Sequence, residues 1–214
     1  MKRKFILVFS ASLVLIIGIV LLCWFTIPRI QYKYDSETDS YFVNKVYGNA
    51  DVYKIENEIH HRPVTKICSR AFMGKDIKRI EFGVNLIEIE RLAFLDCKKL
   101  EEIDLSTVKI IGRNAFENCC KLTSVHLNIE DIMGGTFMGC SSLSQVTLNH
   151  TITLGSYAFA GTGIEVITIP DTCSLVGNDV FDSCNSLKKV IVKSHYLEQN
   201  SYLKSLNIVT FDFN

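Results

Sequence analysis

Residues 115–127, AFENCCKLTSVHL, hold an apolar Ala-Phe pair, a polar turn and a segment in which apolar and polar residues alternate. The same order recurs along the chain, and its clearest marker is a phenylalanine. The marker phenylalanines are spaced 22, 22, 21, 22 and 22 residues apart: Phe72, Phe94, Phe116, Phe137, Phe159 and Phe181. A fixed period of this length is typical of a solenoid, because one unit cannot bury its apolar face alone and must stack on its neighbours.

Each marker is followed by a polar turn and then by an alternating segment. These segments read IKRIEF, LEEIDL, LTSVHL, LSQVTL, IEVITI and LKKVIV, with LNIVTF as a further copy near the C-terminus. Alternation places apolar side chains on one face of a strand and polar side chains on the other. We therefore expect parallel strands, about 4.8 Å apart, that form one continuous ladder.

The combined pattern, L-x-x-I-x-I followed by I-x-x-I-x-x-x-A-F-x-x-C-x-x-L, resembles the BspA-like leucine-rich repeats of bacterial and protist surface proteins. The resemblance covers residues 41–214. The segment IENEIHHRPVTKICSRAF, residues 55–72, is similar to the short hairpin that opens the family's repeat array, with His61 near a position where glycine is usual.

The resemblance implies a repeat solenoid, a leucine-rich repeat with a parallel β-ladder. A short N-terminal hairpin cap would occupy residues 41–63, and residues 64–214 would hold about six repeats and a terminal strand. It also implies a surface scaffold for recognition and not a reaction. It names no ligand, because members of the family differ in what they bind.

The N-terminus has a different composition. MKRK is followed by an uncharged apolar run of 23 residues, Phe5 to Ile27, which is long enough to cross a bilayer as a helix. A cleaved signal peptide has a shorter apolar core and a cleavage site between small residues, and LLCWFTIPRI offers no such site. A lipoprotein signal would use Cys23, but bulky Leu22 precedes it. We predict that residues 1–27 are an uncleaved signal-anchor, a single transmembrane helix.

The charges beside this run set the expected orientation. Lys2, Arg3 and Lys4 should remain cytoplasmic, which leaves the rest of the chain outside the cytoplasm. Residues 28–40 are polar and are predicted to form a solvated stalk between the membrane and the repeats. We therefore expect a single-pass membrane protein whose repeat domain lies at the cell surface.

Composition and motifs argue against several function classes. Lys plus Arg and Asp plus Glu both number 23, so the charge gives no reason to expect a nucleic-acid partner. The five histidines share no metal-ligand spacing, and the chain has no H-E-x-x-H, G-x-S-x-G or glycine-rich phosphate loop. We expect no metal, no cofactor and no enzymatic activity.

The cysteines follow the repeat. Four of them occupy the position three residues after a marker: Cys97, Cys119, Cys140 and Cys184. A buried cysteine packs as a small hydrophobic residue. Zinc sites typically use paired cysteines with a spacing such as C-x-x-C, and the sequence has no such pair. Equivalent Cβ atoms about 4.8 Å apart exceed the usual disulfide separation of about 3.5–4.5 Å, so free thiols are favoured.

Cys120 occupies a different position, which other copies fill with turn and surface residues. We therefore predict that Cys120 is an exposed thiol while Cys119 is buried. Cys120 is either a tolerated substitution or a site of pairing with another chain, and the sequence leaves both open.

The polar positions of the predicted strands form one outward face, the candidate binding face. It consists of Lys78, Arg79, Glu81, Glu101, Glu102, Asp104, Thr123, Ser124, His126, Ser144, Gln145, Thr147, Glu165, Thr168, Lys188 and Lys189. The polar residues of any single predicted strand are compatible with an ordinary solvated surface. As a whole, hydroxyl groups flanked by opposite charges suit recognition of a protein or a glycan on another surface.

Two function classes stay open. One is a membrane-tethered recognition module, for adhesion or interaction at the cell surface. The other is a structural or assembly subunit that stacks on or supports a partner through its C-terminal edge, because an uncovered strand edge can pair with another chain. The oligomeric state is not predicted.

The C-terminal end bears on this choice. We expect Ile208 to face outward and Leu206, Val209 and Phe211 to face the core, with no polar cap after them. Either residues 194–205 fold over the end, with Leu203 among the side chains available to pack, or a second chain covers it.

Overall fold

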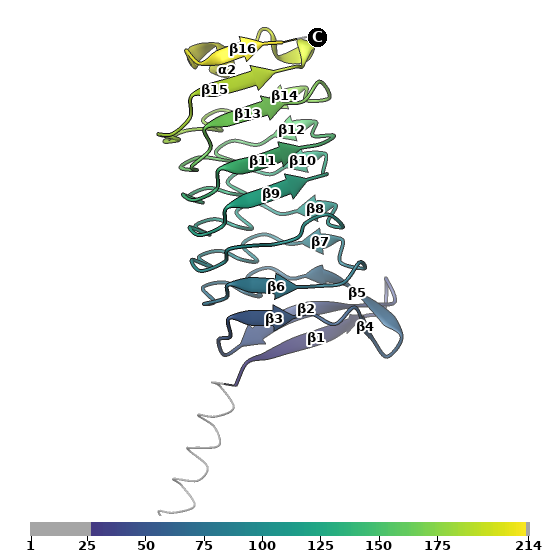
Figure 1. Ribbon diagram of the computed structural model, residues 1–214. Coiled ribbons are helices and arrows are strands. Elements are labelled where there is room, and N and C mark those ends of the chain that lie inside the picture. The colour runs from purple at the N-terminus through teal and green to yellow at the C-terminus, as the bar shows by residue number, and fades with distance from the viewer. Residues whose placement is uncertain (1–26, 213–214) are drawn as a thin grey trace, which may run out of the picture.

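The computed structural model describes residues 27–212, which form a parallel β-solenoid of about eight turns (Figure 1). The prediction of a leucine-rich repeat solenoid is therefore confirmed. Within residues 27–212, no helix has the length and apolar character needed to cross a membrane. The predicted signal-anchor lies outside the described residues except for Ile27, which is exposed.

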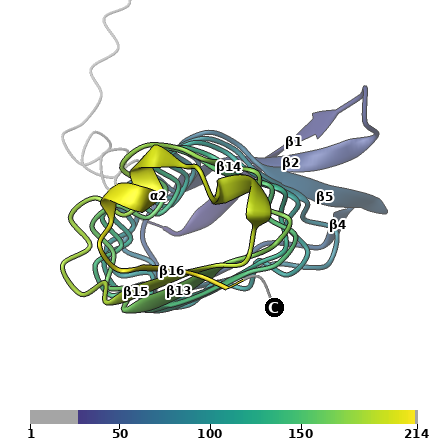
Figure 2. The ribbon, with the colours of Figure 1, turned by 90° about the horizontal axis from the view of Figure 1, so that it is seen from above.

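Two ladders of strands lie on opposite sides of the coil (Figure 2). The front ladder consists of β3 (Val52–Lys54), β6 (Arg79–Glu81), β9 (Ser124–Leu127), β11 (Gln145–Leu148), β13 (Val166–Ile169), β15 (Lys189–Val192) and β16 (Val209–Phe211). The back ladder consists of β2 (Ser40–Tyr47), β5 (Arg62–Ile67), β7 (Glu88–Ile89), β8 (Ile110–Ile111), β10 (Asp131–Ile132), β12 (Thr153–Leu154) and β14 (Leu175–Val176). The turn that carries the marker phenylalanine joins each back strand to the next front strand.

The marker phenylalanines fill the space between the two ladders. All six are buried, and successive rings stack with centroids 4.9 to 6.2 Å apart and interplanar angles of 4 to 13°. Tyr53 packs its edge against Phe72 at a centroid distance of 5.6 Å and so begins the column. The repeat spacing thus produces one continuous aromatic column along the solenoid axis.

The recurring cysteines bond the coils to one another. Cys97 Sγ donates to the Phe72 carbonyl at 3.1 Å, and Cys119 Sγ donates to the Phe94 carbonyl at 3.3 Å. The same bond recurs in two later coils, from Cys140 and Cys184. All seven cysteines of the described residues are free. Each of the four recurring thiols therefore donates to a carbonyl of the preceding coil.

Two of the thiols differ from the prediction. Cys120 is half-buried and not exposed, because its Sγ turns back toward the Asn118 carbonyl at 3.3 Å. Cys184 is also half-buried, although it occupies the recurring buried position. Cys119 is fully buried, as predicted.

The N-terminal part of the chain forms two hairpins. Strand β1 (Arg29–Asp35) pairs antiparallel with β2, and β4 (Glu58–Ile59) pairs antiparallel with β5. The turn between β4 and β5 places His60 at φ 49° and His61 at φ 61°. Histidines therefore adopt the left-handed conformation for which a hairpin turn of this kind normally uses glycine.

Residues 28–40 do not form the predicted solvated stalk. Ile30 and Tyr32 alternate along β1 and pack against the core, and the Tyr32 hydroxyl accepts a hydrogen bond from the Glu56 N–H at 3.0 Å. These two side chains make β1 a cover for the open edge of β2. Strand β1 therefore crosses the base of the solenoid (Figure 1).

The C-terminal coil closes the other end. Helix η1 (His195–Leu197) and α2 (Ser201–Ser205) replace the back strand and the marker turn of this coil, and α2 overlies the preceding turns in the axial view (Figure 2). Leu197 and Leu203 are fully buried. Of the two alternatives for this end, residues 194–205 fold over it. Ile208 packs partly against the core and does not simply face outward.

The front ladder is interrupted, contrary to the prediction of one continuous ladder. Strands pair as β3–β6, β9–β11 and β13–β15–β16. The segment LEEIDL, residues 100–105, forms no strand, and Glu102 makes only an isolated bridge with Arg79. Three carboxylates in one short segment repel one another, and Asp104 Oδ1 accepts a hydrogen bond from the Ser106 N–H at 2.9 Å, which draws the backbone into a turn.

Candidate functional site

The candidate binding face lies on the outer side of the front ladder. Fifteen of its sixteen residues are exposed, and Ser124 is half-buried. The alternation of the sequence explains this placement, because the residues between them point inward, as Val125 and Ile167 do at 1% exposure each. The structure therefore brings the predicted residues onto one surface.

A hollow of about 500 Å³ opens in this face where the ladder is interrupted. Its floor is apolar and includes Phe82, Ile103 and Leu105. Its rim is polar: Arg79, Glu81, Glu102, Asp104, Ser124 and His126. Ile103 is only half-buried here, whereas the equivalent Ile80 is 4% exposed, so the failure of this segment to join the ladder uncovers part of its apolar side chain.

The carboxylates of the rim have unequal partners. Glu81 Oε1 lies 3.3 Å from an Arg79 guanidinium nitrogen, so these two charges offset each other. Lys78 pairs with Asp51 at 2.7 Å and not with the nearby Glu101. Glu102 belongs to none of the ion pairs found within residues 27–212. The hollow therefore carries uncompensated negative charge beside an apolar floor.

His126 joins this hollow to a second one. Its Nδ1 lies 3.1 Å from Thr147 Oγ1, a hydrogen bond between neighbouring front strands. The second hollow, of about 760 Å³, extends past His126 to Asn149, His150 and Thr172 at the edge of the solenoid. The two hollows therefore share His126 as a lining residue.

The candidate-face residues on β11, β13 and β15 line neither of these two hollows. Lys188 Nζ pairs with Glu165 Oε2 at 2.7 Å, so the basic row at the far end is partly neutralised by its neighbour. The hydroxyl-bearing residues between them, such as Ser144 and Thr168, are exposed. The distinctive chemistry of the face is therefore concentrated at the interruption of the ladder.

Within residues 27–212, no group of three or more His, Cys, Asp or Glu side chains, at the hollow or elsewhere, is placed to hold a metal ion. Burial raises the pKa of the Cys97 thiol to about 12 and that of Cys173 to about 11, which keeps both thiols protonated and unreactive near neutral pH. The fold uses these groups for packing.

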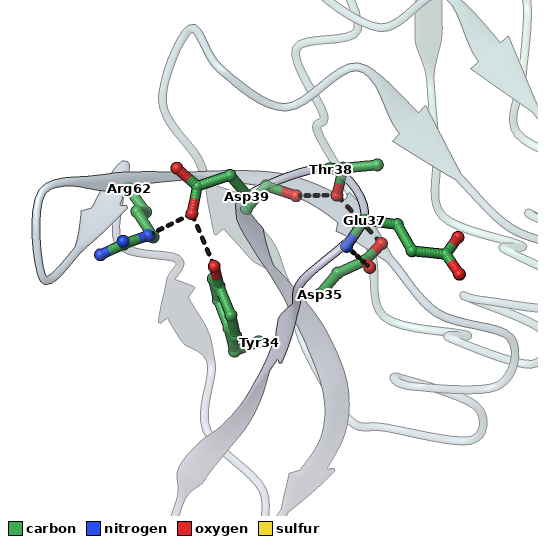
Figure 3. A network of polar contacts seen from close by, with 7 residues as sticks. Tyr34, Asp35, Glu37, Thr38, Asp39 and Arg62 are labelled. Atoms are coloured by element: carbon green, nitrogen blue, oxygen red, sulfur yellow. Dashed lines mark hydrogen bonds and ion pairs between the residues drawn. The ribbon is translucent and has the colours of Figure 1, made fainter.

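A separate polar network holds the tip of the β1–β2 hairpin (Figure 3). The Tyr34 hydroxyl donates to Asp39 Oδ1 at 2.6 Å, and Arg62 forms an ion pair with the same carboxylate. The Tyr34 hydrogen bond and then the Arg62 guanidinium lower the pKa of Asp39. Asp35 holds the turn by accepting hydrogen bonds from the Glu37 N–H and from Thr38 Oγ1. These groups satisfy one another, so the network fixes the hairpin.

The sequence did not reveal the apolar floor of the hollow, because alternation alone assigns Ile103 and Leu105 to the buried side. The signal that marks the site is the set of three acidic residues itself, Glu101, Glu102 and Asp104, whose like charges repel one another and disfavour a strand.

Comparison with known proteins identifies the repeat family of the chain. The model of the BspA type leucine rich repeat region matches in six copies, over residues 65–188 and 109–214. No curated protein matches the chain. A crystal structure of a leucine rich cell surface protein from Faecalibacterium prausnitzii A2-165 is similar, with a TM-score of 0.62 and 24% identity over 79% of this chain and 55% of that one.

A second crystal structure, of a leucine-rich repeat protein from Eubacterium ventriosum ATCC 27560, has a TM-score of 0.53 and 19% identity over 71% of this chain and 49% of that one. The chain thus spans about half the length of these two proteins. Both likenesses concern the fold. The repeat match covers more than half of the chain, and the chain therefore belongs to the family of BspA type leucine rich repeat proteins.

Proposed function

We propose that this protein is a membrane-tethered recognition module at the cell surface, which binds a protein ligand in the acidic hollow of the front ladder. The observation that carries the proposal is the combination of an uncompensated Glu102 carboxylate with the half-buried Ile103 beside it. A lysine or arginine side chain fits this chemistry, because its aliphatic stem packs on apolar surface while its charged head pairs with a carboxylate.

A protein ligand fits better than a glycan. Sugar rings are commonly held against exposed tryptophan or tyrosine rings, and the sixteen residues of the candidate face include neither. The second hollow, which shares His126, offers hydroxyl, amide and imidazole groups to an extended peptide segment. The acidic hollow would then bind one basic side chain, and the second hollow would bind its neighbours.

The assembly alternative has less support. It relied on an uncovered C-terminal end, and Leu197 and Leu203 of this chain are buried there. The recognition proposal needs no second copy of the chain, since both hollows are built from one chain.

The membrane tether is part of the proposal and is supported by the apolar run Phe5 to Ile27. The described chain begins beside β1, at the end of the solenoid opposite β16 (Figure 1). An anchor there would leave the C-terminal coil at the end of the solenoid away from the bilayer. Protease added to intact cells should release the repeat domain, and recovery of soluble protein that starts near residue 28 would show instead that the run is a cleaved signal.

Fluorescence anisotropy tests the ligand class. The probes are a labelled glycine-serine peptide with one central arginine, the same peptide with glutamate in place of arginine, and a labelled neutral oligosaccharide. The arginine peptide should bind the full chain, and Glu102→Gln should weaken it. Glu130→Gln is the matched control, because Glu130 is exposed but does not line the hollow of about 500 Å³. Equal binding of all three probes would rule out charge recognition in the hollow.

A further inference from the structure

A basic and aromatic cluster lies where the described chain begins. Arg29 Cζ is 4.4 Å from the centroid of the Tyr47 ring, and Lys45 Nζ is 5.4 Å from the same centroid. Lys75 Nζ donates to the Gly48 carbonyl at 2.9 Å, next to Tyr47 in the chain. We name these four residues, Arg29, Lys45, Tyr47 and Lys75, the basal cluster.

The two lysines of the basal cluster, Lys45 and Lys75, are not neutralised by acidic side chains. Neither lysine takes part in any ion pair found within residues 27–212. Burial lowers the pKa of Lys75, and the neighbouring Lys45 ammonium lowers it further, which shows that the two cations are close enough to repel. Such a field attracts anions.

Charge is distributed unevenly along the β1–β2 hairpin. The basal cluster lies at the open end of the hairpin, where Arg29 is opposite Tyr47. The acidic residues Asp35, Glu37 and Asp39 lie at the turn (Figure 3). Arg29 and Asp35 are the two ends of β1, six residue steps apart, which is about 20 Å. The end nearest the start of the described chain is therefore positive, and the distant end is negative.

The apolar run of the sequence ends next to the basal cluster. Only Pro28 separates Ile27 from Arg29, so the Cα atoms of Ile27 and Arg29 are at most about 7 Å apart. The headgroup layer on each side of a bilayer core is about 5–8 Å thick. If the run spans the bilayer, as proposed above, the basal cluster lies within reach of that layer.

We propose that the basal cluster docks on anionic phospholipid headgroups of the membrane that holds the anchor. This inference rests on the proposed membrane tether. Arginine and lysine side chains pair with the lipid phosphates, and the Tyr47 ring takes a position typical of aromatic residues at the interface. The acidic hairpin turn points away from the surface, since like charges repel. The docked base sets the inclination of the solenoid relative to the membrane.

Fluorescence quenching tests the docking in the full chain. Trp24→Phe removes the only tryptophan, and Tyr47→Trp then places an indole in the cluster. The protein is reconstituted in nanodiscs of phosphatidylcholine alone or with phosphatidylglycerol, and a headgroup spin-labelled lipid serves as the quencher. The indole at position 47 should be quenched more strongly in discs with phosphatidylglycerol, and added salt should reduce the difference.

Charge variants give the size of the effect. Arg29→Gln and Lys45→Gln should each lower the ratio of docked to undocked protein about fivefold, the equivalent of about 1 kcal/mol per cation. Lys121→Gln removes the same charge at an exposed site in a distant turn and should leave the ratio unchanged. An indole introduced by Tyr196→Trp, at a position 77% exposed in the C-terminal coil, should be quenched in neither disc.

The outcomes separate the docking from the tether. If the chain stays in the discs through a carbonate wash and the indole at position 47 is quenched no more than the one at position 196, the docking is wrong and the tether stands. If the wash removes the chain, the tether is wrong and the docking falls with it.

Discussion

The hydroxyl of Tyr202 accepts a hydrogen bond from the Phe181 backbone N–H at 2.8 Å. In the preceding coil the equivalent N–H, of Phe159, donates to the backbone carbonyl of Val180 at 3.0 Å. Asn200 acts in the same way, because its Nδ2 donates to the Val176 carbonyl at 3.2 Å. Side chains of the last coil therefore replace the backbone groups that each other coil receives from its neighbour.

Removing one of these side-chain groups should loosen the end of the solenoid. Tyr202→Phe leaves the Phe181 N–H without its partner, and we expect a loss of about 1–3 kcal/mol in the free energy of unfolding. Chemical denaturation measures the loss, and amide hydrogen exchange at Phe181 should accelerate. Tyr196→Phe, at an exposed tyrosine, should change neither quantity. Unchanged exchange at Phe181 in Tyr202→Phe would show that the hydroxyl has no capping role.

The aromatic column should dominate the stability of the array. Phe116 lies between the rings of Phe94 and Phe137, at centroid distances of 5.1 and 5.4 Å. Phe116→Ala should therefore cost about 3–5 kcal/mol, and Thr123→Ala, at an exposed position of the same repeat, well under about 1 kcal/mol. Denaturant titration compares the two. Equal midpoints for both variants would contradict the register of the repeat.

The buried thiols predict how stability depends on pH. Burial raises the pKa of Cys97 from 9.0 to about 12. Between these values the unfolded chain loses the thiol proton while the folded chain keeps it, so the unfolded state binds fewer protons and the free energy of unfolding falls as pH rises. Below about pH 9 both states are protonated and Cys97 contributes no slope. Cys97→Ala should reduce the decline by up to about 1.4 kcal/mol per pH unit.

Thr162→Ala is the matched control for Cys97→Ala, because Thr162 occupies the equivalent position in another coil. It should lower stability through the loss of its hydrogen bond to the Phe159 carbonyl and leave the pH slope unchanged. Slopes that respond equally to both substitutions would mean that Cys97 does not titrate in this range.

Alkylation should distinguish the two adjacent cysteines. Cys119 is fully buried and burial raises its pKa well above 9.0, whereas Cys120 is half-buried. Under native, non-reducing conditions near neutral pH, iodoacetamide should therefore modify Cys120 faster than Cys119, because only an accessible thiolate reacts. Mass spectrometry of the digested protein measures both rates. Equal rates would contradict the placement of Cys119 in the core.

The period of the phenylalanines was sufficient to predict the solenoid, the buried column and the outward face. It acts through a strict geometric constraint, since residues such as Phe94 and Phe116 must superpose when coils stack. The fold of residues 194–205 over the C-terminal end was one of two alternatives, because this segment contains apolar residues at a place where the core needs covering.

Other features depend on interactions that periodicity does not encode. Strand β1 was predicted as a stalk because its polar residues outnumber Ile30 and Tyr32, yet these two suffice to cover the edge of β2. The segment LEEIDL fits the strand pattern, but the repulsion of its carboxylates and the turn at Asp104 disfavour a strand there. The hollow therefore lies where an acidic segment with the alternating pattern does not form a strand.

A reciprocal charge exchange at Glu102 tests the recognition proposal most directly. The dissociation constants of the arginine and glutamate peptides are measured for the native chain and for Glu102→Lys by fluorescence anisotropy. We expect the native chain to prefer the arginine peptide, Glu102→Lys to weaken that peptide by about tenfold or more, the equivalent of about 1.4 kcal/mol, and the same variant to gain affinity for the glutamate peptide. Unchanged affinities for both peptides in Glu102→Lys would contradict the assignment of the front hollow as the binding site.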